Sequence, residues 1–195
     1  MSPRTGVDVM LGVLLIGLTV LVSRGATDRV DLAVFRTLLP YRTGGAAQVA
    51  DLVVALAQPA AVAVATVSFA VLRAARDGSI SPLRVLVPPV VVVVVAVVVV
   101  KAVLHRAGPP GTHALGLLGY YPSGHTATSL VCAGAVARWV SLRRPGRRGA
   151  AVAVAATWTG VVGSSMVLPG YHWLTDVLGA VLAGVLILRL LDRLR

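Results

Sequence analysis

Three short polar stretches interrupt an otherwise apolar chain. Lys101 and Arg106 lie in the first, Ser123, Gly124 and His125 in the second, and the third runs from residue 170 to residue 176 as Gly-Tyr-His-Trp-Leu-Thr-Asp. An arginine can hold two phosphate oxygens at once, whereas a lysine acts as a point charge. Together with the histidines, these cations favour a site that binds a phosphate group and acts on it chemically.

The second and third stretches each open an apolar run that we expect to be a helix. Free N–H groups at the start of a helix favour an anion, and glycine lets a ligand approach the backbone closely. His172 and Asp176 are four residues apart, so they are predicted to share one helix face. A carboxylate beside an imidazole fixes its tautomer and stabilises the imidazolium. His125 offers a second imidazole, which suits general acid catalysis near neutral pH.

The composition indicates what class of protein positions these residues. The chain has 195 residues, of which 57% are hydrophobic and 13% are charged, and its mean hydropathy is +0.88. A soluble core of this size cannot hide so much apolar surface, so the composition excludes an ordinary soluble domain, a disordered chain and a coiled coil. We therefore predict an integral membrane protein that forms one domain over residues 1–195.

The chain is strongly basic, with a formal net charge of +11. All seven acidic residues are aspartates, and the only lysine is Lys101. The arginines cluster between apolar runs, as loop charges of a membrane protein do, so we expect no nucleic-acid partner. The single cysteine, Cys132, lies within an apolar run, and one cysteine excludes an intramolecular disulfide bond.

Apolar runs of about 20 residues predict transmembrane helices. The expected fold is all-α, a bundle of six transmembrane helices with a short interfacial amphipathic helix after the first. The first helix is expected to be a retained signal anchor, because Ser-Arg-Gly-Ala from residue 23 is a poor cleavage site. The amphipathic helix is expected at residues 28–40. The six spans are expected at residues 7–22, 49–72 with a kink at Pro59, 83–104, 125–142, 150–168 and 172–191.

The basic residues predict how these helices are oriented in the cell membrane. With the N-terminus inside, the inner segments hold 12 of the 18 lysines and arginines, and the outer segments hold 6. Both termini are then cytoplasmic, and the three polar stretches converge on the outer face. All four tyrosines fall on the same side, as an interfacial aromatic belt would: Tyr41, Tyr120, Tyr121 and Tyr171.

The Pro-Ser-Gly-His string from residue 122, followed by His172-x-x-x-Asp176, resembles the type 2 phosphatidic acid phosphatase (PAP2) family, which also includes vanadium haloperoxidases and glucose-6-phosphatase. The resemblance covers residues 101–176 and the six-helix layout around them. It implies a metal-independent phosphatase with no cofactor. His172 would be the nucleophile that forms a phosphohistidine, Asp176 would orient it, and His125 would protonate the leaving alkoxide. The phosphate oxygens would be held by Lys101, Arg106, Ser123 and Gly124.

Two positions depart from the family's pattern. The family places an arginine seven residues after the lysine, where this chain has Gly108, although Arg106 lies two residues earlier. The family's third stretch begins Ser-Arg, where this chain has Ser165 and Met166. Loss of a preorganised charge donor can cost about 3 kcal/mol of transition-state stabilisation. The departures therefore point to slow turnover or to a pocket that accepts a different headgroup.

The sequence thus predicts a membrane phosphatase that hydrolyses a lipid phosphate or diphosphate at the outer membrane face. The candidate substrates are phosphatidic acid, phosphatidylglycerol phosphate, a polyprenyl phosphate or diphosphate, and a lipid-linked sugar phosphate. The Arg-, Ala- and Val-rich composition suggests a GC-rich bacterial genome, which favours a polyprenyl carrier of the cell envelope. The alternatives are a catalytically weak or inactive lipid-phosphate binder and a lipid phosphotransferase that uses the same histidine. A metal site is not expected, because His105 and His113 lack partners at metal-ligand spacing.

Overall fold

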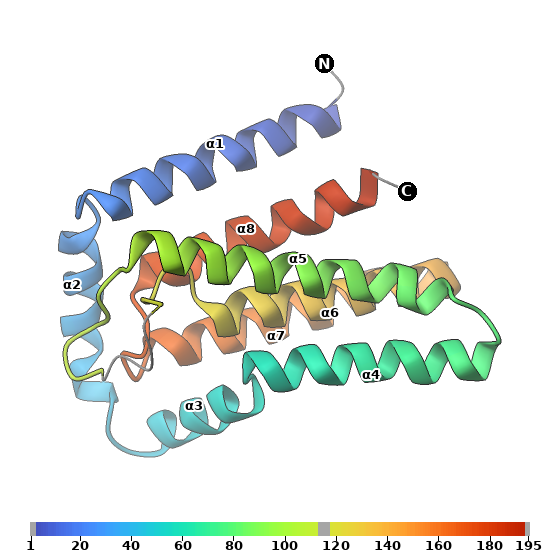
Figure 1. Ribbon diagram of the computed structural model, residues 1–195. Coiled ribbons are helices and arrows are strands. Elements are labelled where there is room, and N and C mark those ends of the chain that lie inside the picture. Colours follow the sequence, from blue (N-terminus) through green and yellow to red (C-terminus); the bar gives the residue numbers. More distant parts are fainter. Residues whose placement is uncertain (1–2, 113–117, 194–195) are drawn as a thin grey trace.

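The computed structural model describes residues 3–112 and 118–193, and all regular secondary structure in these ranges is helical. The long helices lie side by side, and α2 lies across one end of the bundle (Figure 1). The all-α fold is confirmed, and α2 forms where the amphipathic helix is predicted. The elements are α1 (Pro3–Ser23), α2 (Asp28–Leu38), η1 (Leu39–Tyr41), α3 (Gly45–Leu56), α4 (Pro59–Asp77), α5 (Ser81–Leu104), α6 (Gly124–Arg143), η2 (Pro145–Arg147), α7 (Arg148–Val167) and α8 (Leu174–Arg193).

Five helical segments within the described ranges are long and apolar enough to cross a membrane. They comprise α1, α4, α5, α7 together with η2, and α8. Helix α6 has a similar length but more polar residues, and it contacts α4, α5, α7 and α8. Such a helix faces protein on several sides, so small and polar residues can pack there in place of a lipid-facing apolar surface. The structure thus supports a multi-pass membrane protein, and a count of six spans stays a prediction.

The expected second span is wrong as one continuous helix. Residues 49–72 belong to α3 and α4, which Ala57 and Gln58 separate. Pro59 occupies the first turn of α4, where its missing N–H costs nothing. The residue before a proline avoids helical geometry, and Gln58 is extended with ψ of 122°. Pro59 therefore starts a new helix, and α3 leaves the line of α4 to pack against α7.

Tyr121 is not an interfacial residue, in contrast to the sequence-based expectation. Its side chain is 1% exposed, and its hydroxyl lies 2.9 Å from Oγ1 of Thr19 on α1. The ring packs directly on α8 at Gly179, where a Cβ atom would lie only 2.5 Å from the ring. Tyr121 therefore connects α1 and α8 to the loop before α6. Tyr41 and Tyr171 are exposed, as an interfacial position requires.

Ion pairs connect the helices at the end of the bundle opposite α2. Both described termini, which belong to α1 and α8, lie at that end (Figure 1). Each pair joins two different helices, so the charges stabilise the packing of the bundle as well as marking its end. The pairs are Asp8 with Arg189 and Arg193, Asp77 with Arg143, and Asp192 with Arg138.

Candidate active site

A tight turn after α5 brings both predicted cations to one loop. His105 ends α5 with φ of 45°, in the left-handed region that few residues other than glycine adopt. Gly119 packs on this turn, because a Cβ atom at Gly119 would lie 2.8 Å from the backbone nitrogen of Arg106. Lys101, one turn before the end of α5, donates from Nζ to the carbonyl oxygens of Gly119 at 2.8 Å and Tyr120 at 3.3 Å. The loop before α6 is therefore fastened to the end of α5.

The start of α6 carries the second group of predicted residues. Ser123 is fully buried and caps the helix, where its Oγ accepts hydrogen bonds from the N–H of Thr126 at 3.4 Å and from the Thr126 hydroxyl at 3.1 Å. The N–H of Ser123 donates to the carbonyl oxygen of Asp176 at 3.0 Å, which joins the starts of α6 and α8. Gly124 and His125 follow as the first two residues of α6.

His125 has an unsatisfied ring nitrogen. Its Nε2 is buried and has no hydrogen-bond partner in the described ranges. His125 lies within electrostatic range of His172 and Lys101. A buried polar atom without a partner is costly and calls for an explanation. A bound ligand would provide the missing partner.

His172 and Asp176 meet at the start of α8. Nδ1 of His172 lies 3.0 Å from Oδ2 of Asp176, and these side chains are 9% and 0% exposed. The pair forms as the spacing predicts, but not along one helix face, because α8 begins at Leu174 and His172 precedes it. Oδ2 of Asp176 also accepts the N–H of Trp173 at 3.1 Å, as a carboxylate in the first turn does in a capping box.

The guanidinium of Arg106 lies against Asp176. Its Nη1 donates to Oδ1 of Asp176 at 2.5 Å and to the hydroxyl of Thr175 at 2.8 Å. Its Nη2 donates to Oδ2 of Asp31 at 2.6 Å and, more weakly, to the hydroxyl of Thr27 at 3.3 Å. Arg106 therefore reaches the site, but both terminal nitrogens already bind carboxylates. This geometry does not favour the expected role of Arg106 as a direct phosphate ligand.

Asp31 is the site residue that the sequence reasoning missed. It lies on α2 and is 1% exposed. Besides the bond from Arg106, its Oδ1 accepts the N–H of Thr175 at 3.0 Å and its Oδ2 accepts the Thr175 hydroxyl at 2.6 Å. The available signal was its position in α2, because Asp31 shares a helix face with the apolar Phe35 and Leu38. A carboxylate within an apolar stripe needs a buried partner.

The two positions without the family's arginine are occupied differently in this structure. A Cβ atom at Gly108 would lie 2.4 Å from the ring of Tyr120, which itself stands edge-on to His172 with ring centroids 5.6 Å apart. A larger residue at Gly108 would therefore displace Tyr120 from His172. The side chain of Met166 is buried, and its carbonyl oxygen accepts the N–H of His172 at 3.0 Å. Met166 thus contributes to the site through its backbone.

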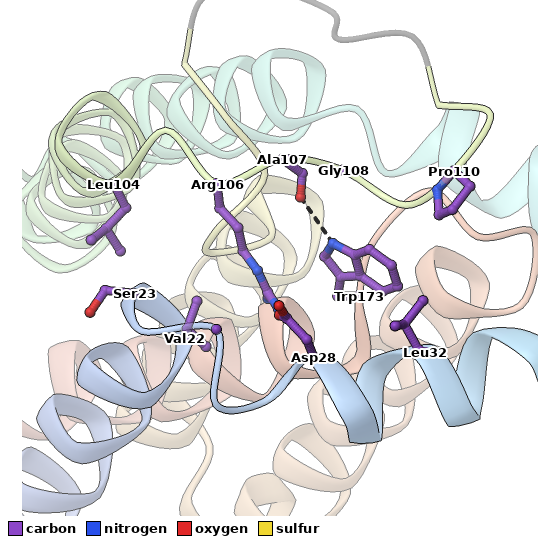
Figure 2. A pocket seen from close by; sticks show the side chains of 11 residues that line it. Val22, Ser23, Asp28, Leu32, Leu104, Arg106, Ala107, Gly108, Pro110 and Trp173 are labelled. Carbon is purple, nitrogen blue, oxygen red and sulfur yellow. Dashed lines mark hydrogen bonds and ion pairs between the residues drawn. The ribbon is translucent and has the colours of Figure 1, made fainter.

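A cavity of about 470 Å³ is lined in part by Arg106 and lies between the α1–α2 connection and the loop after α5. Figure 2 shows Arg106 extending across it toward Asp28, with Trp173 alongside. The Trp173 indole donates to the carbonyl oxygen of Ala107 at 2.9 Å, and Nη2 of Arg106 lies 3.8 Å from Asp28. The cavity thus borders the site through Arg106 and Trp173.

Metal-ligating side chains do not gather at this site. Within residues 3–112 and 118–193, no three or more His, Cys, Asp or Glu side chains are placed to hold a metal ion. His105 is exposed in the turn after α5, and His113 lies outside the described residues.

Comparison with known proteins identifies the family. The model of the PAP2 superfamily matches residues 90–194, which include every predicted site residue. The chain belongs to the PAP2 superfamily. The fold of this PAP2 protein is similar to the crystal structure of the first transmembrane PAP2 type phosphatidylglycerolphosphate phosphatase from Bacillus subtilis, with a TM-score of 0.86 and 19% sequence identity over 96% of this chain and 94% of that one. No curated protein sequence matches the chain.

Proposed function

We propose that this PAP2 protein is a membrane phosphatase that hydrolyses a lipid phosphate or diphosphate through a phosphohistidine, without a metal ion. The observation that carries the proposal is the buried His172–Asp176 pair, with its 3.0 Å contact. It lies where α6 begins, within electrostatic range of His125, whose Nε2 has no partner in the described part of the chain. Two imidazoles and a carboxylate are the groups that a nucleophilic phosphoryl transfer requires.

The chemistry takes two steps. Nε2 of His172 attacks phosphorus, the bond from phosphorus to the lipid oxygen breaks, and His125 donates a proton to the leaving oxygen. A water molecule then attacks the phosphohistidine, the nitrogen–phosphorus bond breaks, and His125 takes a proton from that water. Before the attack, donation from Nδ1–H to Asp176 keeps the lone pair on Nε2, and in the phosphohistidine the same bond stabilises the positive ring.

The phosphate group is held mainly by Lys101, the Ser123 hydroxyl and the backbone N–H of Gly124. Ser123 caps the N–H of Thr126, whereas the N–H groups of Gly124 and His125 have no carbonyl partner within the helix and would be available to an anion. Arg106 contributes by holding Asp176, since both of its terminal nitrogens bind carboxylates. With fewer cations on the phosphate than the family's pattern provides, we expect slow turnover rather than a loss of phosphate binding.

A groove along the bundle supports a lipid as the substrate. Its volume is about 610 Å³, and it is lined by α6 from Ser129 to Val140 and by residues of α4, η2 and α7. Its lining contains no predicted site residue, and Ser129, one helical turn beyond His125, is its residue on α6 nearest to the site in sequence. Its lining is largely apolar, as a lipid tail requires. We place the site at the outer face, on the strength of the arginine distribution.

Release of inorganic phosphate tests the proposal. The purified protein in detergent would be given phosphatidic acid, phosphatidylglycerol phosphate and polyprenyl phosphates and diphosphates, each with EDTA present. The phosphatase of similar fold is named for phosphatidylglycerol phosphate, whereas the composition favours a polyprenyl carrier, so the panel also decides the substrate. We expect release that survives EDTA, disappears in His172→Asn, and persists in His105→Asn.

The control at His105 makes the same chemical change at an exposed histidine in the turn after α5, a left-handed position that asparagine tolerates. Release by His172→Asn at the wild-type rate would exclude the phosphohistidine. A folded wild-type protein that binds lipid phosphates but releases none would favour the inactive binder, and product formed only with an alcohol acceptor would favour the phosphotransferase.

A further inference from the structure

Helix α2 brings a buried carboxylate to the site from outside residues 90–194, the range that the family model covers. We propose that Asp31 is a positioning residue: it holds the Arg106 guanidinium so that Arg106 and the start of α8 together fix Asp176 against His172. The effect that we predict on kcat rests on the proposed function. The effect that we predict on the position and environment of the His172 ring does not.

The charges of the buried cluster explain why Asp31 matters. Arg106 lies between the carboxylates of Asp31 and Asp176, at 2.6 and 2.5 Å, so one positive charge is shared by two negative charges. Ion pairs are strong where water is excluded, and the side chains of Arg106, Asp31 and Asp176 are 9%, 1% and 0% exposed. Without Asp31, Asp176 would be the one buried carboxylate bound to Arg106 in the described ranges, because Asp28 is exposed and its Oδ1 is 3.8 Å away. Asp176 would then stabilise the positive His172 ring less, which weakens the nucleophile.

Asp31 also holds the backbone from which Asp176 projects. It accepts both the N–H and the hydroxyl of Thr175, the residue just before Asp176. The N–H of Trp173 is satisfied by Asp176 itself, so two carboxylates from two helices cap the first turn of α8. If Asp31 acted only as a cap of α8, its loss would have the same effect with or without Arg106. If Asp31 acts by positioning Arg106, its loss should have an effect only when Arg106 is present, so the two roles can be separated by experiment.

Asp28 is a matched control on the same helix. It lies three residues before Asp31, its side chain is 62% exposed, and its Oδ1 is 3.8 Å from the same nitrogen of Arg106. Asp28→Asn therefore removes the same charge from the same face of the protein, but without breaking a buried hydrogen bond. Differences between Asp31→Asn and Asp28→Asn report on the buried contact and not on the net charge of α2.

The kinetic test is a double-mutant cycle measured with the best lipid phosphate of the panel. We expect Asp31→Asn to lower kcat about 30-fold with KM changed less than about two-fold, and Asp28→Asn to change kcat less than about two-fold. In an Arg106→Gln background, adding Asp31→Asn should change kcat less than about two-fold, because the asparagine oxygen can still accept the N–H of Thr175 and the remaining effect passes through Arg106. If the losses of kcat caused by Asp31→Asn and by Arg106→Gln add up in the double variant, the positioning role would be overturned and Asp31 would act only as a cap. If Asp31→Asn alone does not fold, the comparison of Arg106→Gln with the double variant still decides the question.

A spectroscopic test is independent of turnover. The ring signals of His172 in 15N-histidine-labelled protein, assigned with His172→Asn, should shift in Asp31→Asn and stay in place in Asp28→Asn. If the wild type hydrolyses no lipid phosphate but His172 responds in this way, the proposed function fails and the positioning role stands. If the enzyme is active and Asp31→Asn matches Asp28→Asn in both kinetics and spectra, the positioning role fails and the function stands.

Discussion

At the residue scale, the two imidazoles of the site differ in their partners. Nδ1 of His172 is bound to a buried carboxylate, whereas Nε2 of His125 is buried with no partner in the described ranges. A carboxylate that binds one ring nitrogen makes the other more nucleophilic, which suits His172 to attack. His125 has no carboxylate partner in the described part of the chain, and its Nε2 is left for the leaving oxygen of a substrate.

These roles predict a dependence on the leaving group. A general acid matters most when the leaving oxygen is strongly basic, as an alkoxide is, and contributes about 100- to 10,000-fold there. We expect His125→Asn to slow release of the leaving group in the first turnover strongly for a lipid phosphate but little for p-nitrophenyl phosphate, whose leaving group needs no proton. The second step, in which His125 takes a proton from water, is common to both substrates, so single-turnover rates and not steady-state rates make the comparison. His172→Asn should abolish the first turnover with both substrates, and an equal slowing of the first turnover on both substrates in His125→Asn would remove it as the acid.

The site residues differ in how far the sequence can predict them. Ser123, Gly124 and His125 are adjacent, and His172 and Asp176 are four residues apart, so local spacing is enough to propose them. Asp31 is 75 residues from Arg106 and 144 from Thr175, and no local pattern encodes a contact over such distances. The sequence predicts Arg106 as a phosphate ligand, and this role stays a prediction; the structure brings its guanidinium to Asp176 and Asp31.

At the element scale, hydropathy predicts where helices lie better than where they break. The apolar run of residues 49–72 gives no sign that α3 leaves α4 and packs on α7, because that choice depends on a tertiary contact. The sequence predicts a kink at Pro59, but a proline is compatible with both a kink and the start of a helix. Helix α6 is the opposite case, because its polar residues lower its hydropathy, yet it packs within the bundle and lines the groove.

The groove yields a prediction on neighbouring residues of α7. Ala155 lines the groove, whereas Ala156 is exposed and does not line it. We expect Ala155→Trp to lower kcat/KM for a long-chain lipid phosphate about ten-fold, equal to about 1.4 kcal/mol of lost packing, because the indole fills space that the tail would occupy. A short-chain phosphate ester should be unaffected, and Ala156→Trp should change neither substrate. Equal effects of both variants on the long-chain substrate would contradict the groove as a tail site.

At the scale of the whole molecule, the bundle separates charge by end. The inner segments hold 12 of the 18 basic residues, so arginine is in excess at the end opposite α2 even though aspartates pair with some of these arginines. At the site end, Lys101 contacts carbonyl oxygens and Arg106 contacts carboxylates. Excess arginine in short loops favours the cytoplasmic side. We therefore predict that the site end faces outward, which would set the leaflet from which a substrate comes.

Single cysteines test this orientation directly. Cys132 is buried, so Cys132→Ser supplies a background without thiols, to which either Thr43→Cys at the site end or Gly146→Cys at the opposite end is added. Both positions are exposed, Thr43 between η1 and α3 and Gly146 within the short η2 that connects α6 to α7, which limits the effect of the substitution on folding. In intact cells we expect a membrane-impermeant maleimide to label Thr43→Cys at once and Gly146→Cys only after permeabilisation. The reverse pattern would place the site at the cytoplasmic face. That result would not bear on the phosphohistidine chemistry. The substrate would then be a lipid phosphate of the inner leaflet, and a carrier lipid that is dephosphorylated outside the cell would be excluded.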